Sequence, residues 1–201
     1  MPRRLSHVRG QLRLVVATLA ILGCATLGGC TASGTSKARA GGPIGSQGNP
    51  VVLSCAQESF LPYPRSVPRH PGPGDLAVGP LFIINGKLQA SATPGDHGSY
   101  AKIPFVVVPG SVVTVTIGAQ ARAQVGIDNP YARAWGAGLV TAATYRPCSG
   151  QMGFFAQGFT FRHGQTRACV PLSIQVDHER LVRHVTISLG AGACAGAGVS
   201  A

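Results

Sequence analysis

The chain has 201 residues with a formal net charge of +11, and 45% of its residues are hydrophobic. This apolar content suits a folded core, and the length suits one domain of about 150 residues better than two. The basic residues are scattered singly and lack the interleaved aromatic side chains typical of nucleic-acid binding, so no nucleic-acid partner is expected.

The first thirty residues combine a basic start with a short apolar run. Four arginines precede the apolar segment 14–27, which is shorter than the roughly 20 residues that cross a bilayer core as a helix. The segment ends in Leu27-Gly28-Gly29-Cys30, where small residues separate a leucine from a cysteine. A basic region, a short apolar region and small residues, in that order, are typical of an export signal.

The motif Leu27-Gly28-Gly29-Cys30 resembles the lipobox of bacterial lipoproteins, and the resemblance is limited to these first thirty residues. It implies that Cys30 receives a diacylglycerol and becomes the first mature residue after cleavage. The protein is then expected at the cell membrane, lipid-anchored and facing the extracytoplasmic side. Cys24 is a rival anchor, but Leu22 is large where the motif prefers a small residue. A cleaved soluble signal and a retained helix are the alternatives.

Cysteine parity agrees with an anchor at Cys30. Cleavage there removes one cysteine and lipid occupies a second, which leaves an even number for pairing in an oxidising compartment. We predict the disulfides Cys148–Cys169 and Cys55–Cys194. The first would close a loop of about 22 residues and contribute roughly 3 kcal/mol in the chain-entropy model. Zinc is the alternative, but C-x-x-C pairs and Cys/His clusters at ligand spacing are absent from the sequence.

The mature chain divides by composition. Residues 30–50 are rich in Gly, Ser, Ala and Thr and predict a flexible tether between the signal (1–29) and a folded domain (51–194), with a disordered tail at 195–201. In the domain, short runs of β-type residues alternate with turn signals such as Asn85-Gly86 and Pro109-Gly110. The expected strands before the last hairpin are 51–55, 81–84, 105–108, 112–117, 139–145 and 159–161.

The clearest pattern lies near the end of the domain. Apolar and polar residues alternate on both sides of the polar segment Asp177–Arg180, which predicts a β-hairpin from Val170 to Leu189 with one face in the core. Pro171 must then lie where no ladder hydrogen bond is needed. Two stretches, Leu61–Pro80 and Gln120–Ala137, are expected to be irregular loops. The whole pattern predicts an all-β fold, a single antiparallel β-sandwich of about seven to nine strands.

Candidate chemistry is sparse. The sequence lacks a G-x-S-x-G nucleophile motif, and its six carboxylates are expected at turns and on the surface, so neither a catalytic residue nor a cofactor nor a metal is predicted. Tyr131, Arg133 and Trp135 form the predicted ligand-binding set, because exposed aromatic rings near an arginine stack on sugars or contact a protein. The alternative is that Trp135 covers one end of the core.

The sequence therefore favours a non-enzymatic, membrane-anchored binding module. Its expected partners are the membrane, through the lipid, and a cell-envelope polymer or protein, with the scattered positive charge favouring anionic lipid headgroups or acidic polymers. The alternative is a small exported enzyme or metal-binding protein with a site built from loops. A pocket that gathers two of these side chains would favour that alternative: His70, His97, His163, Asp96 and Asp128.

Overall fold

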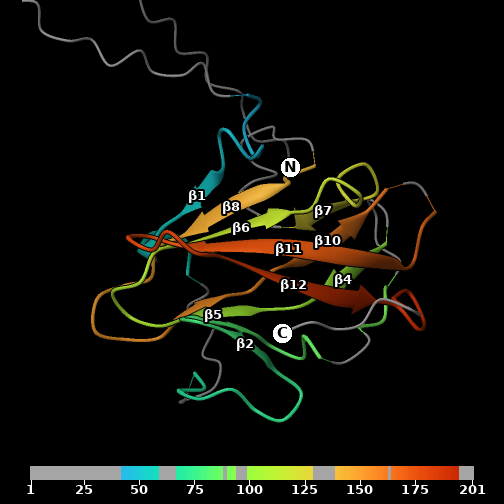
Figure 1. Ribbon diagram of the computed structural model, residues 1–201. Helices are drawn as coiled ribbons and strands as arrows, with labels where there is room; N and C mark the ends of the chain where they lie inside the picture. The colour runs from blue at the N-terminus through green and yellow to red at the C-terminus, as the bar shows by residue number, and fades with distance from the viewer. Residues whose placement is uncertain are drawn as a thin grey trace, which may run out of the picture. The chain divides into compact units, whose positions relative to one another are not determined.

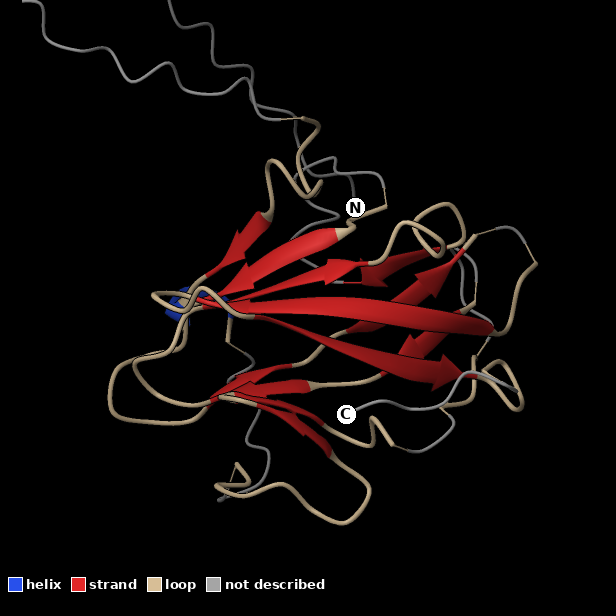
Figure 2. Cartoon of the chain, in the orientation of Figure 1, coloured by secondary structure: helices blue, strands red, loops and turns tan. Residues whose placement is uncertain are grey.

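The computed structural model describes residues 42–58, 67–87, 90–93, 99–128, 139–162 and 164–194 (Figures 1 and 2). These residues form twelve β-strands and one short 3₁₀ turn, Cys55–Gln57. The protein is all β, as its sequence predicts. Within the described residues, no helix has the length and apolar character needed to cross a membrane.

The largest sheet has five strands in the spatial order β1-β8-β6-β11-β12. Strand β1 runs parallel to β8, whereas the other neighbours in this sheet are antiparallel. The long strands β11 and β12 cross the middle of Figure 1. The strand bounds are β1 (Val51–Leu53), β8 (Ala142–Tyr145), β6 (Val113–Ile117), β11 (Ala168–Val176) and β12 (Val182–Leu189).

Two smaller antiparallel sheets complete the fold. One has the order β2-β3-β5-β9 and the other β4-β10-β7. The bounds are β2 (Leu76–Val78), β3 (Leu81–Ile83), β5 (Phe105–Val107) and β9 (Gly153–Phe155) in the first, and β4 (Tyr100–Lys102), β10 (Gly158–Phe161) and β7 (Val125–Asp128) in the second.

A single apolar core joins the three sheets. Phe105 of β5 lies edge-on to Tyr145 of β8 and to Phe159 of β10, with ring centroids 5.4 and 6.3 Å apart. Tyr145 also lies edge-on to Phe155 of β9 at 5.1 Å. All four rings are fully buried, and each pair links two different sheets. Because tilted ring pairs of this kind are favourable, the aromatic cluster holds the layers of a sandwich-like fold together.

The β11–β12 hairpin confirms the strongest sequence prediction. Alternate residues of β11 are buried, and the polar turn contains His178 at a φ of 68°. The Pro171 carbonyl accepts the Gly118 N–H at 2.7 Å, just beyond the last β6 residue that pairs with β11. Because the N and C=O of a strand residue point to the same side, the nitrogen of Pro171 faces Gly118, just past the end of β6, where the missing donor leaves the pairing within β6 itself intact.

Several predictions about the strands were wrong. Twelve strands replace the expected seven to nine, and β2 and β7 lie inside the stretches Leu61–Pro80 and Gln120–Ala137 that we expected to be loops. Strands of three or four residues are too short to show a period of two in the sequence. The proline-rich setting of β2 is compatible with its position, because β2 is an edge strand.

The hydrogen-bonded part of the domain begins before the predicted boundary at residue 51. The Gly45 carbonyl accepts the N–H groups of Thr141 and Ala142, and Arg122 donates to the side chain of Gln47 at 2.9 Å. Residues 42–50, which the sequence assigns to the tether, are thus bonded to the start of β8 and to the turn that follows β6. Backbone contacts of this kind need no apolar periodicity, so composition does not reveal them.

Candidate functional site

Several predicted site residues lie outside the described part of the chain. These are the lipid-attachment residue Cys30, the ligand-binding set Tyr131, Arg133 and Trp135, and the loop residues Asp96, His97 and His163. Of the residues named for a loop-built site, the structure describes His70, which is exposed in the segment before β2, and Asp128, the last residue of β7. The lipid site and the aromatic set therefore remain predictions.

The four predicted disulfide cysteines are all paired, but the predicted partners were wrong. The disulfides are Cys55–Cys148 and Cys169–Cys194, with Cα atoms 4.6 and 4.8 Å apart. Strands β1 and β8 are parallel, so the segments that follow them, with Cys55 and Cys148, leave the sheet at the same end. The antiparallel β11–β12 pair brings the start of β11, with Cys169, close to the chain after β12, with Cys194.

The Cys55–Cys148 corner also contains a buried carboxyl group. Glu58 is 5% exposed, and its Oε1 atom accepts the backbone N–H of Cys148 at 2.6 Å. Burial raises the pKa of this carboxyl group above its usual value, and the hydrogen bond from Cys148 opposes the rise. The expectation that all carboxylates lie at turns and on the surface was thus wrong for Glu58.

A glycine makes room for this carboxyl group. A Cβ atom on Gly153 would lie 2.9 Å from Oε1 of Glu58 and 2.5 Å from Cβ of Pro147, closer than van der Waals contact permits. The ligand-type atoms of Cys55, Glu58 and Cys148 lie within 4.8 Å of one another. Among the described residues, this is the one place where three His, Cys, Asp or Glu side chains lie close enough together to hold a metal ion.

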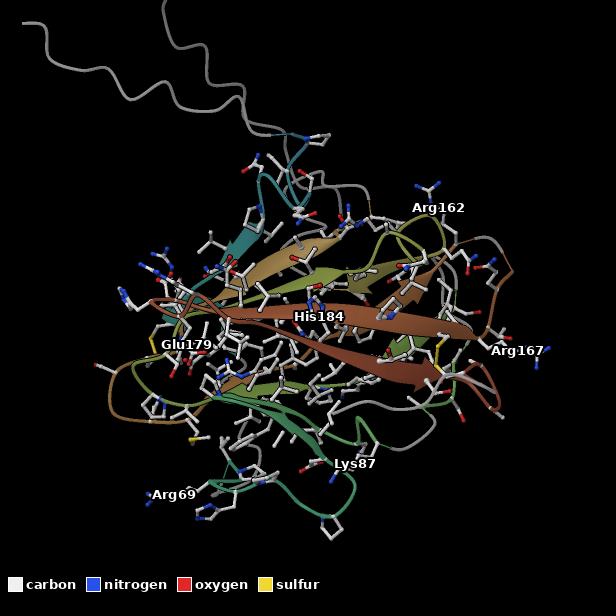
Figure 3. The ribbon with its side chains drawn as sticks, viewed as in Figure 1. Arg69, Lys87, Arg162, Arg167, Glu179 and His184 are labelled. Atoms are coloured by element: carbon white, nitrogen blue, oxygen red, sulfur yellow. A yellow bond between two sulfur atoms is a disulfide. The ribbon has the colours of Figure 1, made fainter. Side chains whose placement is uncertain are left out.

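The outer face of the five-stranded sheet carries paired polar side chains. Thr114 and Thr144 share a hydrogen bond between their hydroxyls at 2.8 Å, and Ser173 shares one with Nδ1 of the exposed His184 at 3.1 Å. Ser173 and His184 are direct cross-strand partners, and Figure 3 shows His184 over the middle of the sheet. A serine beside a histidine can act as nucleophile and base, but a third group must orient the histidine. Cross-strand polar pairs are also the usual lining of a solvated sheet face.

Positive charge dominates the described surface because much of the negative charge is buried or paired. Besides Glu58, Asp75 is 7% exposed and accepts the N–H groups of Gly72 and Asn85 at 2.7 and 2.8 Å. Glu179 is ion-paired with Arg183. The labelled cations in Figure 3 lie on separate parts of the fold instead of forming one patch. Among the residues that the structure describes, the exposed cations are Arg69, Lys87, Lys102, Arg146, Arg162, Arg167 and Arg180.

Fold and site together define a disulfide-bonded, all-β domain with a basic surface. No family model, no curated protein and no solved structure matches this chain.

Proposed function

We propose that this protein is exported and lipid-anchored through Cys30, and that its β-sandwich domain binds an anionic component of the cell envelope without catalysing a reaction. The observation that carries the proposal is the complete pairing of the four cysteines after Cys30. Two disulfides in one small domain are typical of an oxidising compartment. They also leave Cys30 without a cysteine partner in the domain, as a lipid-attachment residue requires.

The charge distribution supports an anionic partner. Cleavage before Cys30 removes four of the 17 Lys and Arg residues of the full chain, so the mature chain keeps 13 against six Asp and Glu residues. Two of those six, Glu58 and Asp75, are buried, and a third, Glu179, is ion-paired. Scattered cations give a long-range attraction to headgroups or acidic polymers and no defined geometry for a small ligand.

The anchor is tested by Cys30→Ala in a bacterial host fed a clickable fatty acid. We expect the variant to lose the lipid label and to leave the membrane fraction or to accumulate unprocessed, because the acceptor thiol is gone. The matched control, Cys24→Ala, should keep label and fractionation. If Cys30→Ala kept its lipid label, or Cys24→Ala lost it, the assignment of Cys30 would be wrong.

The class of binding partner is tested with a shortened chain that begins at Thr31 and therefore lacks the lipid anchor. We expect it to sediment with phosphatidylglycerol vesicles and not with phosphatidylcholine vesicles. Binding should weaken as salt rises from 0.1 to 1 M, because the Debye length falls from about 10 to about 3 Å. Equal binding to both vesicles, or binding that salt leaves unchanged, would count against electrostatic attachment.

A further inference from the structure

The Cys55–Cys148–Glu58 corner has a donor set that the proposed function does not use. Cys55 and Cys148 are half-buried residues, and Glu58 is almost fully buried beside them. Thiolate sulfur and carboxylate oxygen are both good ligands for Zn²⁺ and related thiophilic divalent cations. All three donors already lie within 4.8 Å of one another, on backbone that the surrounding sheet holds in place.

The geometry of the corner suits a tetrahedral cation once the sulfurs are separated. At a Zn–S bond length of about 2.3 Å, two thiolates of a tetrahedral site stand about 3.8 Å apart. The Cα atoms of Cys55 and Cys148 are 4.6 Å apart, so side-chain rotation can separate the sulfurs without moving the backbone. Glu58 follows Cys55 by three residues in one tight turn, and its N–H donates to the Cys55 carbonyl at 3.2 Å.

The carboxyl group is also oriented before any cation arrives. The Cys148 N–H donates to Oε1 of Glu58 at 2.6 Å, and Gly153 leaves the space in which that oxygen lies. Hydrogen bonds that orient a ligand atom in this way are a regular feature of metal sites. Both cysteine residues are partly exposed, so a water molecule is the fourth ligand that we expect.

We propose that the corner binds a thiophilic divalent cation when a dithiol reductant has opened the Cys55–Cys148 bond. The reductant supplies two electrons and two protons, which convert the bridge into two thiols, and is itself oxidised to a disulfide. The cation then displaces both thiol protons into solvent, and two thiolates, the Glu58 carboxylate and water complete its coordination. The closed bridge and the bound cation exclude each other, so the thiol redox state controls the site.

The second disulfide provides the internal comparison. Among the described residues, no third ligand group accompanies Cys169 and Cys194 at the same spacing. Reduction therefore gives two thiols there as well, but without a carboxylate beside them.

The test uses the full-length chain in detergent, with Cys24 and Cys30 changed to serine so that the domain cysteines are the only thiols. The chain is reduced with a phosphine and titrated with Cd²⁺, which forms an ultraviolet thiolate-to-cadmium charge-transfer band. We expect one Cd²⁺ per reduced chain, none for the oxidised chain, and displacement of Cd²⁺ by Zn²⁺.

Two pairs of variants assign the site. Glu58→Gln should weaken Cd²⁺ binding by at least about tenfold, since loss of even an outer partner costs on the order of tenfold to a hundredfold. Glu179→Gln, at the β11–β12 turn, should leave it unchanged. Cys55→Ser should abolish the site, and Cys169→Ser should preserve it.

Equal affinity in the parent and in Glu58→Gln, or loss of binding in Cys169→Ser, would overturn the proposal. Reduction alone can loosen the domain, so near-ultraviolet circular dichroism is recorded in the same titration. If the reduced parent has lost its signal, Cd²⁺ must restore it in the parent and not in Glu58→Gln, because metal binding and folding are coupled. Failure to restore it would equally refute the site.

Discussion

The two disulfides have different structural roles in the same fold. Cys55–Cys148 has a sequence separation of 93 and joins the ends of two parallel strands over a buried carboxyl group. Cys169–Cys194 has a separation of 25 and fastens the chain after β12 to the start of β11. The first bridge thus fixes a long-range pairing that local sequence does not specify. The second reinforces a hairpin that its own alternation already specifies.

Atoms are closely packed around both disulfides, the first corner at Cys55–Cys148 and a second corner at Cys169–Cys194. At the first, Gly153 admits the side chain of Glu58. At the second, a Cβ atom on Gly190 would lie 2.5 Å from Cβ of Arg167, and Gly190 has a φ of 84°. A glycine near each bridge thus lets neighbouring atoms approach closely, but only near the first bridge does an ionisable group, Glu58, occupy the space gained.

The largest difference between the corners should appear when each bridge is removed. In the chain-entropy model, the loop of the first bridge contributes about 4.6 kcal/mol and that of the second about 3.5 kcal/mol. We expect Cys55→Ser/Cys148→Ser to lower the free energy of unfolding more than Cys169→Ser/Cys194→Ser does, measured by urea denaturation. The reverse order would show that loop length does not govern their contributions.

A smaller effect tests the packing around Glu58. Gly153→Ala introduces a methyl group against Pro147 and Glu58, and overpacking of this kind costs about 1–3 kcal/mol. Gly48→Ala is the matched control, because its nearest non-neighbouring atom would lie 3.7 Å away. Thermal unfolding should show a lower Tm for Gly153→Ala and little change for Gly48→Ala. Equal melting temperatures would mean that the first corner is looser than its distances indicate.

The smallest effect concerns the charge of Glu58. The pKa of Glu58 in the folded state is raised above 4.5, so folding favours the protonated carboxyl group. The stability that this protonated group contributes is complete below pH 4.5. It is lost as the pH rises through the folded-state pKa. Glu58→Gln places a neutral side chain at this position, so stability is no longer lost through its ionisation as the pH rises. The amide oxygen of the glutamine can still accept the Cys148 N–H. We therefore expect the variant to be more stable than the parent at pH 7 and similar below pH 4.

Urea titrations across this pH range measure the difference directly. A Glu58→Gln variant that is less stable than the parent at pH 7 would mean that the ionised carboxylate is stabilising. Glu179→Gln serves as the control for a carboxylate at the surface, where the side chain is ion-paired with Arg183 and partly exposed.

The sequence by itself determined the class of the fold and its regular parts. Alternation along residues 170–189 is a local property of the chain, so the hairpin and its polar turn could both be predicted. The same holds for the core-facing residues of β6, and for Pro171, whose missing donor restricts where it can lie. The even number of cysteines after Cys30 likewise indicated two bridges.

Only the tertiary structure decided which distant segments meet. The parallel β1–β8 pair joins residues far apart in the sequence, and no local pattern marks it, so the disulfide partners and the burial of Glu58 could not be derived. Strands such as β2 and β7 are short and become strands through their neighbours. The alternation of apolar and polar residues indicates which face of a strand is buried. The pairing of strands across long loops, in contrast, depends on the packing of the whole core.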